Sequence, residues 1–337
     1  MENRTKIEIP TVTIIKVVLV ILLLWFLYAV RDVVVLFFIV LVIVAALGPL
    51  VDRMSRHIPR VLAMIILSLT FLTILAAIGY LIIPPVVSQL QQLAVNLPYI
   101  MDKLGPLYQT LKDSVSHYQE QLLNLSSQVI TVTSGIFSTT LGFVEGLIAV
   151  ITIVILSFYM LLEAKTIKGF LYSLMPAERK EQIVDVLKKI ANKMGSWMRG
   201  QVTLMLVIGI LDGIALMILG VPYALTLAVW GALTEVIPYV GPWLGLLPAF
   251  LIALTISPLK ALFVLIAYIL IQQLESQFLA PKIMGKAVGL SPVIIILALL
   301  CGAKLMGILG VIIAVPIAAA LAVLIQEWPD LKKIREN

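Results

Sequence analysis

PYALTLAVWGALTEVIPYVGPWLGLLPAFLIALTI, at residues 222–256, is too long and too apolar to be one ordinary helix. As a straight helix it would reach about 50 Å, whereas the hydrocarbon core of a membrane is about 30 Å thick. The run PYVGP near its centre cannot continue a helix, because proline lacks an N–H donor and glycine breaks regularity. We therefore predict a re-entrant helical hairpin. Backbone turns at membrane depth only where protein or a water-filled cavity covers it.

The rest of the sequence is similarly apolar, and only a lipid environment suits it. Hydrophobic residues make up 61% of the chain and charged residues 12%, with a mean hydropathy of +1.12, which leaves too little polar surface for a soluble protein. A second long stretch, residues 292–325, is interrupted by Gly and Pro like the first. Six further stretches have the roughly 20 apolar residues that one span needs. They are residues 12–30, 33–50, 61–83, 141–162, 202–219 and 261–280.

The predicted fold is an all-α polytopic membrane protein with about six transmembrane helices plus two re-entrant helical hairpins, eight hydrophobic segments in all. In the C-terminal half a span followed by a broken segment occurs twice, which suggests an inverted repeat because the two spans would run in opposite directions. Glycine and proline mark the candidate hinges and breaks of the hairpins. These are Gly231, Pro248, Gly302, Gly307, Gly310 and Pro316.

Lysine and arginine set the predicted orientation. If the N-terminus is cytoplasmic, most of the 24 basic residues fall in cytoplasmic segments, as the positive-inside rule requires, and the C-terminus is cytoplasmic as well. The net charge of +6 is therefore interpreted as a topology signal of a multi-pass protein in the cell membrane. The expected partner is the lipid bilayer, and no nucleic acid is expected.

The hydrophobic pattern divides the chain into six regions. Two of them are expected to stand out of the bilayer: the polar region 84–140, an external helical domain, and the basic region 163–200. The basic region contains an amphipathic helix that either lies on the inner membrane surface or packs against the cytoplasmic ends of the protein. The other regions are the N-terminal transmembrane helices 1–83, the transmembrane helix 141–162, the transport core 201–327 with both hairpins, and the cytoplasmic tail 328–337.

Polar and charged side chains inside the apolar segments are the candidates for a substrate or ion site. A charge near the bilayer centre costs roughly 2.5–3.5 kcal/mol and normally faces a partner or a wet cavity. Asp212 has an alternative role as a structural acid paired with a lysine such as Lys304. Glu235 precedes the PYVGP turn and either binds a ligand or caps the helix. The full candidate set is Asp212, Glu235, Pro238, Tyr239, Gly241, Pro242, Gln272, Glu275, Gln277 and Lys304.

The polar end of the span 261–280 also has two interpretations. Gln272 and Glu275 share one helical face, so this end either lines a cavity or forms an interfacial rim. Lys304, at the predicted tip of the second hairpin, either neutralises Glu235 or Glu275 or attracts an anionic ligand.

No residue arrangement typical of an enzyme is present in the sequence. His57 lies in a basic loop and His117 in the polar region, and neither has a Ser, Cys or acid at a spacing that suggests a nucleophile or a metal site. One Cys and two His are too few ligands for a Cys/His zinc site. The sequence therefore predicts no enzyme activity, no cofactor and no metal.

A series of short motifs runs through the C-terminal half. They are RGQ (199–201), GVPY (220–223), EVIPYVGP (235–242), ESQ (275–277), APKIMGK (280–286), GLSP (289–292), GILG (307–310) and VP (315–316). In this order, the motifs resemble those of the autoinducer-2 exporter (AI-2E) family of membrane transporters. The resemblance implies a homo-oligomer with two helical hairpins per protomer and an elevator-like movement. It also implies export of autoinducer-2 or, for some members, sodium/proton exchange.

Three functions remain open from the sequence. The first is export of a small polar molecule such as autoinducer-2 past the hairpins. The second is a Na⁺/H⁺ antiporter that uses Asp212, Glu235 or Glu275, because competition between a proton and Na⁺ for one acid suffices for exchange. The third is a membrane scaffold without transport, whose external domain and basic helix bind partners.

Overall fold

The structure is a computed structural model that describes residues 11–77, 140–177, 180–284 and 289–333. Within these ranges the regular structure is helical, and no strand occurs. The predicted external domain lies outside the described residues except for its last residue. The elements are α1 (Thr11–Ala29), α2 (Arg31–Met54), the helix Arg60–Ala77, α5 (Thr140–Leu162), α6 (Ala164–Leu174), α7 (Lys180–Ile218), α8 (Ala224–Thr234), α9 (Gly241–Ile256), α10 (Pro258–Leu274), the π-helical turn Glu275–Leu279, α11 (Ala280–Met284) and α12 (Pro292–Lys333).

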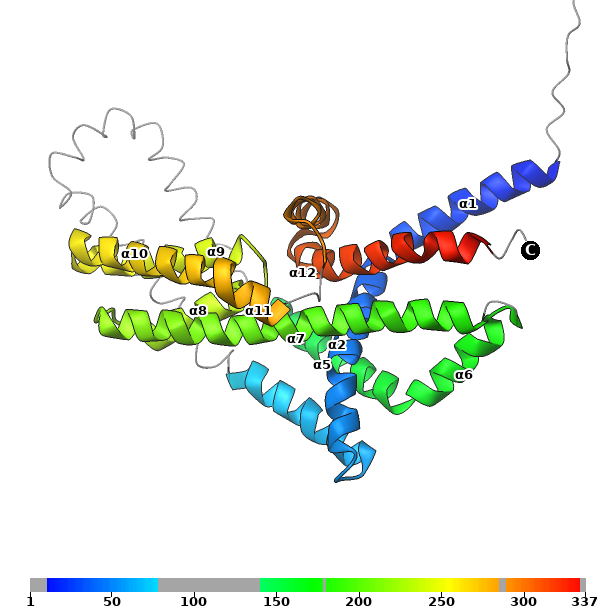
Figure 1. The fold of residues 1–337 in the computed structure, drawn as a ribbon, viewed down its shortest axis with the longest axis horizontal. Coiled ribbons are helices and arrows are strands. Elements are labelled where there is room, and N and C mark those ends of the chain that lie inside the picture. The colour runs from blue at the N-terminus through cyan, green and yellow to red at the C-terminus, as the bar shows by residue number, and fades with distance from the viewer. Residues whose placement is uncertain (1–10, 78–139, 178–179, 285–288, 334–337) are drawn as a thin grey trace, which may run out of the picture.

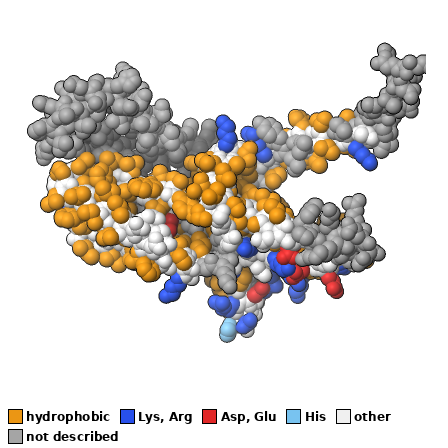
Figure 2. Space-filling model, turned by 45° about the horizontal axis from the view of Figure 1, so that its top comes forward, with side chains coloured by type: hydrophobic (Ala, Val, Ile, Leu, Met, Phe, Trp, Pro, Cys, Tyr) orange, Lys and Arg blue, Asp and Glu red, His pale blue; other side chains and the backbone are white. Residues whose placement is uncertain are grey.

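Five of the described helical segments are long and apolar enough to cross a membrane. They are Arg31–Met54, Arg60–Ala77, Lys180–Ile218, Pro258–Met284 and Pro292–Glu327. A sixth is added if α5 and α6, which are bent by 72° at a short break, form one span. The predicted all-α polytopic fold is thereby confirmed, whereas the count of eight hydrophobic segments stays a prediction. Figure 2 shows hydrophobic side chains over a broad area of one face, with Lys and Arg beside it.

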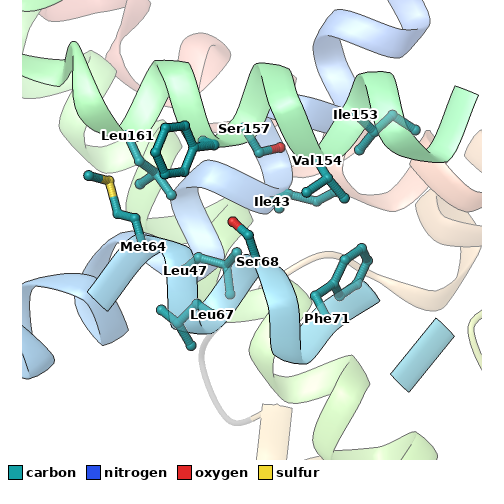
Figure 3. Close-up of a pocket in the computed structure, with 11 residues that line it drawn as sticks. Ile43, Leu47, Met64, Leu67, Ser68, Phe71, Ile153, Val154, Ser157 and Leu161 are labelled. Atoms are coloured by element: carbon teal, nitrogen blue, oxygen red, sulfur yellow. The ribbon is translucent and has the colours of Figure 1, made fainter. Parts of the chain in front are cut away.

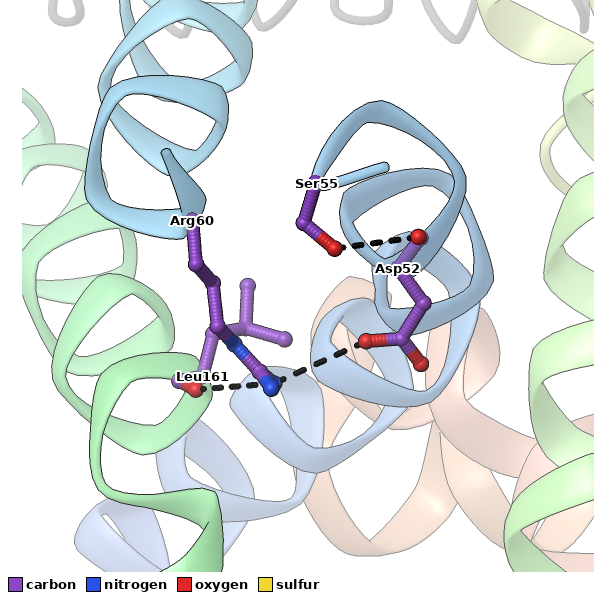
Figure 4. A network of polar contacts seen from close by, with 4 residues as sticks. All are labelled: Asp52, Ser55, Arg60 and Leu161. Atoms are coloured by element: carbon purple, nitrogen blue, oxygen red, sulfur yellow. Dashed lines mark hydrogen bonds and ion pairs between the residues drawn. The ribbon is translucent and has the colours of Figure 1, made fainter. Parts of the chain in front are cut away.

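An N-terminal unit consists of α2, the helix Arg60–Ala77 and α5. At one end of this unit Arg60 Nη2 donates a hydrogen bond to the Leu161 carbonyl at 3.4 Å and lies 3.7 Å from Asp52 Oδ1 (Figure 4). Ser55 Oγ donates to the Asp52 carbonyl at 3.0 Å and closes the same turn. One arginine thus holds the ends of three helices together.

The same three helices line a small cavity. Ser68 and Ser157 present hydroxyl groups to it among apolar side chains, and the Ser157 hydroxyl is buried without a hydrogen-bond partner (Figure 3). The cavity volume is about 20 Å³, which is enough for about one water molecule.

Helix α7 joins the basic region to the membrane part of the chain. It runs without interruption for 39 residues, so the predicted region boundary between residues 200 and 201 falls inside one helix. Its basic half packs on α2 and α12, where Met194 meets Val42 and Ala320. In the view of Figure 1, α7 runs across the molecule with α9, α10 and α12 above it and α6 and the helix Arg60–Ala77 below it. Helix α7 therefore contacts the N-terminal unit through α2 and the two hairpins through α8 and α12.

A proline in α2 creates the contact between α2 and α7. Pro49 has no N–H to offer to the carbonyl of Ala45, four residues before it. Arg199 on α7 supplies the missing donor, with Nη1 at 3.3 Å from the Ala45 carbonyl and 3.2 Å from the Ala46 carbonyl. Gly195 allows this approach, because a Cβ there would overlap the Ala45 carbonyl. A buried carbonyl without a partner is unfavourable by about 1–3 kcal/mol, so the arginine donor stabilises this contact.

The stretch 222–256 is a helical hairpin, as predicted. Its arms are α8 and α9, which are 11 and 16 residues long, and the chain between them is not helical. The arms lie close together: a Cβ at Gly245 would come 3.0 Å from the Gly231 Cα. A core cluster of side chains from the end of α7, α8, α9 and α10 encloses the hairpin. The cluster comprises Leu216, Val221, Ala224, Leu227, Leu246, Ala249, Ala253, Ala261, Val264 and Tyr268.

The stretch 292–325 also folds back on itself. Met306 (φ −145°, ψ 15°) and Gly307 (φ 60°, ψ −139°) interrupt α12, and the two halves meet where a Cβ on Gly302 would overlap the Gly310 carbonyl. In a straight helix the Cα atoms of these two glycines would be about 12 Å apart. The helix therefore reverses at Gly307.

The other predicted hinge positions lie within continuous helix. Gly231 is inside α8 and Pro248 inside α9, whereas Gly302, Gly310 and Pro316 lie in the helical halves of α12. The glycines serve instead as close-contact points, because their missing Cβ lets backbones touch. Pro248 is tolerated because a side chain supplies a substitute donor: Trp230 Nε1–H donates to the Leu244 carbonyl, four residues before the proline, at 3.0 Å.

Candidate functional site

Asp212 enters the site from the middle of α7. Gly209 and Gly213 bring α7 against α8, since a Cβ at Gly209 would lie 2.7 Å from the Ala232 Cβ. The close approach brings the Asp212 carboxylate into contact with Gly231. A Cβ built on Gly231 would come 2.8 Å from Asp212 Oδ2. The side chain is only 2% exposed, so its neighbours decide its chemistry.

Glu235 enters from the tip of the first hairpin, at the end of α8. Its carbonyl accepts a hydrogen bond of 2.5 Å from Gln201 Nε2 on α7, which ties the tip to that helix. The tip is compact: a Cβ on Gly241 would overlap the Thr234 carbonyl, and Tyr239 adopts a left-handed conformation with φ 66°. A bulky residue there is unfavourable, by about 1–3 kcal/mol, and is retained only where the surroundings require it. Glu235 is 1% exposed.

Glu275 enters from the end of α10. The chain forms a π-helical turn at Glu275–Leu279, an irregularity that often occurs at functional sites because it redirects side chains. Gln272 lies within hydrogen-bonding reach of the Glu275 side chain, as expected for two residues on one helical face. Tyr268, two turns earlier, lies within electrostatic reach of Asp212.

The three carboxyl groups form one buried cluster. The side chains of Glu235 and Glu275 lie within hydrogen-bonding reach of each other, and both lie within electrostatic reach of Asp212. Two carboxyl groups can share a hydrogen bond only if a proton lies between them. We call this cluster, together with Gln201 and Tyr268, the acid site.

Every member of the acid site carries an oxygen without a hydrogen-bond partner. These atoms are Gln201 Oε1, Asp212 Oδ1, Glu235 Oε2, Tyr268 OH and Glu275 Oε2. Within the described residues no Lys or Arg forms an ion pair with the three acids. A buried polar atom without a partner is unfavourable by about 1–3 kcal/mol. Five such atoms on neighbouring residues make this cluster the candidate site.

The remaining candidates from the sequence lie apart from these oxygens. Lys304 is exposed on the second hairpin, and the expected neutralisation of Glu235 or Glu275 is not observed. Gln277 is exposed, so it faces away from the acids. Tyr239 is exposed as well, and its role is to shape the tip through its backbone. Pro238 and Pro242 are half-buried in the same turn, on either side of the buried Gly241.

Sequence reasoning missed Gln201 and Tyr268 as site residues. Gln201 stands at the border of a basic and an apolar segment, where a polar residue is unremarkable. Tyr268 is a common residue in a membrane helix because its ring is largely apolar. The available signal for Gln201 was its place in the RGQ motif.

A site for a tightly held metal ion is not found. No group of three or more His, Cys, Asp or Glu side chains close enough to hold a metal occurs in the described part of the chain.

Comparison with known proteins gives this arrangement its context. The profile of the family described as AI-2E family transporter matches residues 14–330. The chain belongs to the AI-2E family. As an AI-2E protein it is a transport protein, and its apolar helices make it a multi-pass membrane protein.

Individual relatives of this AI-2E protein cover most of its length. YueF of Bacillus subtilis is 30% identical over 308 residues, covering 86% of this chain and 82% of the relative. YrrI of the same organism is 31% identical over 278 residues, covering 80% and 79%. Both are named as candidate transport proteins. The AI-2 transport protein TqsA of Escherichia coli is 26% identical over 319 residues, covering 88% and 86%.

Proposed function

We propose that this AI-2E protein exports a small polar molecule such as autoinducer-2 across the cell membrane, with the acid site as its binding site. The observation that carries the proposal is the set of five buried oxygens without partners, because a passing solute with hydroxyl groups would satisfy them. The relation to TqsA, which is named for AI-2 transport, agrees with this substrate.

The positions of the acids support the proposal further. Glu235 lies at a helix break, and Glu275 lies at a π-helical turn, so both stand on backbone that departs from regular helix. Membrane transporters build substrate sites at such interrupted helices, since the freed backbone groups and rare charges meet the solute together. The hairpins would carry the site by an elevator-like movement within a homo-oligomer whose termini are cytoplasmic.

Flux measurements with purified protein test the proposal. Proteoliposomes loaded with labelled autoinducer-2 furanone should release it faster than protein-free vesicles loaded in the same way. Asp212→Asn, Glu235→Gln and Glu275→Gln should each slow release. Glu163→Gln is the matched control, because Glu163 is an exposed acid at the start of α6. No flux above that of protein-free vesicles would contradict the proposal.

Cation/proton exchange is a second candidate function. The proximity of the Glu235 and Glu275 side chains favours it, because two carboxyl groups that hydrogen-bond each other hold a proton that an entering cation could displace. A Na⁺ pulse should then release protons from loaded vesicles, and a pH-sensitive dye would record them. Exchange that persists unchanged after all three acids are replaced by amides would contradict this candidate.

A further inference from the structure

Helix α6 has an apolar face and a basic side. Its apolar side chains recur at intervals of three and four residues, so they lie along one side of the helix. They are Ile167, Phe170, Leu171 and Leu174, and we call them the apolar face of α6. Lys165 and Lys168 lie away from this face, and α6 contains no acid. A helix of this pattern is typical of the boundary between lipid and water.

The described residues leave the apolar face of α6 uncovered. None of the 11 residues of α6 is buried. Phe170 is 63% exposed and Leu174 is 66% exposed. The basic half of α7, by contrast, packs on α2 and α12. An amphipathic helix of the basic region can pack on the protein or lie on the membrane, and α7 takes the first position and leaves the second to α6.

The angle between α5 and α6 suits a position on the membrane surface. Helix α5 has 23 residues, so its length of about 35 Å crosses the hydrocarbon core without any part of α6. Helix α6 turns away from α5 by 72° at the break between them. Because a spanning helix stands near the membrane normal, α6 lies close to the plane of the membrane.

The contacts at the end of α5 place the start of α6 at the edge of the bilayer. Arg60 Nη2 donates to the Leu161 carbonyl and lies 3.7 Å from Asp52 Oδ1 (Figure 4). These contacts bring the end of α5 level with the adjoining ends of α2 and of the helix Arg60–Ala77, which are both long and apolar enough to span. The ends of three spanning helices mark the boundary of the hydrocarbon core. Helix α6 therefore begins at that boundary.

Positive charge gathers on the side of α6 away from the apolar face. Lys180, at the start of α7, has its Nζ 5.4 Å from the centre of the Tyr172 ring. By helical spacing, Tyr172 shares its side of α6 with Lys165 and Lys168. These three lysines form no ion pair within the described residues. Lysines at this depth are attracted to the phosphate groups of acidic phospholipids.

We propose that α6 is a membrane-surface helix whose apolar face enters the lipid, while Lys165 and Lys168 contact the phosphate groups of acidic phospholipids. The helix then connects α5, which crosses the membrane, to α7 along the surface of the bilayer. This lipid contact does not depend on which solute the protein carries.

Nitroxide labels on two sides of α6 test its position. Cys301 is the single cysteine of the chain, so Cys301→Ser gives a background for one label at a time. Leu174→Cys places a label on the apolar face, and Ser173→Cys places one beside it on the polar side. In vesicles, each label collides with oxygen, which concentrates in lipid, and with a water-soluble nickel complex. The ratio of oxygen to nickel collisions should be at least about threefold higher at residue 174, because only the apolar face enters the lipid.

Two other results would overturn the proposal. Frequent collisions with the nickel complex at both sites would place α6 in water. Rare collisions with both reagents at residue 174 would show that protein, such as a second copy of this chain, covers the apolar face. Phe170→Cys repeats the measurement one turn earlier, so one poorly folded variant does not decide the result.

Lipid composition tests the contact of the lysines. Replacing part of a neutral phosphatidylcholine bilayer by phosphatidylglycerol should raise the collision ratio at residue 174 by about twofold or more. Lys165→Gln together with Lys168→Gln should lose most of this increase. Lys260→Gln together with Lys304→Gln removes the same charge elsewhere and should keep it. An equal response of the two double variants would refute the contact with acidic phospholipids.

Discussion

The hairpin α8–α9 and the hairpin within α12 both follow a glycine in the left-handed region, Gly220 with φ 59° and Gly289 with φ 58°. Their tips nevertheless have different surroundings. Glu235 at the first tip is fully buried, whereas Lys304 near the second tip is exposed. The comparison shows that a helix reversal does not by itself bury its tip. The tip is buried where neighbouring helices pack around the hairpin, as α7 and α10 pack around the first one.

The largest expected difference between the hairpins concerns transport. Glu235→Gln should reduce furanone flux by at least about tenfold, which corresponds to about 1.4 kcal/mol, because it changes a buried acid of the site. Lys304→Gln should leave flux close to wild type because that side chain is exposed. Initial rates in proteoliposomes, normalised to reconstituted protein, measure both. A large loss in Lys304→Gln would show that the second tip also takes part.

A pair of glycine substitutions separates stability from transport. Gly241→Ala should destabilise the protein by about 1–3 kcal/mol, since the new methyl group overlaps the chain next to Glu235. Gly307→Ala should cost a similar amount for another reason: its surroundings are open, but its φ of 60° is strained for alanine. Thermal unfolding in detergent measures the destabilisation.

Only the first of these two glycine variants should also impair transport per folded molecule, because only its methyl group displaces the acid site. Equal loss of specific flux in both variants would mean that the second hairpin is coupled to the acid site more tightly than its exposed tip suggests.

The bond between the arms of the first hairpin should have a smaller effect. Trp230→Phe removes the donor to the Leu244 carbonyl and should destabilise the protein by about 0.5–1.5 kcal/mol. Trp243→Phe is the matched control, since Trp243 is exposed and its indole forms no hydrogen bond with the described residues. Unfolding midpoints compare the two. Equal unfolding midpoints would show that the hydrogen bond from Trp230 to Leu244 does not stabilise the hairpin.

The smallest expected effect concerns the glycines that precede the hairpins. Lys260 Nζ donates to the Gly220 carbonyl at 3.0 Å, and Lys193 Nζ lies near Gly289. Lys260→Met should lower stability by at most about 1 kcal/mol, because the bond is exposed. Lys193→Met should change it less. The same unfolding assay applies, and a larger effect of Lys193→Met would reverse the ranking.

Much of the fold could be predicted from the sequence, because lipid leaves few options for an apolar chain. The break at residues 238–242 follows from the chemistry of proline and glycine, and the structure has a helical hairpin there. Length, together with the interrupting Gly and Pro residues, also predicted the reversal of the second stretch. The role of Pro248 could not be predicted, because it depends on the indole of Trp230, which lies on the other arm.

The acid site could be predicted only in part. Asp212, Glu235 and Glu275 were recognisable because charge is rare in membrane helices. Their mutual contact could not be derived, since it depends on how closely α7 approaches α8 and on the π-helical turn at Glu275. Lys304 was expected to balance these acids because opposite charges often pair in membranes, but its position in sequence gave no information on which way the tip faces.

The two proline-freed carbonyls, at Ala45 and Leu244, also constrain how the protein is made. Each has lost its usual donor and obtains a substitute from a different helix, Arg199 in one case and Trp230 in the other. In a ribosome-bound nascent chain, Trp230 emerges before Pro248, so the first hairpin can integrate with its substitute donor already in place. Ala45 emerges long before Arg199. Until α7 is synthesised, the Ala45 carbonyl needs another hydrogen-bond donor. Another protein can supply it, or water can if the carbonyl stays at the membrane boundary.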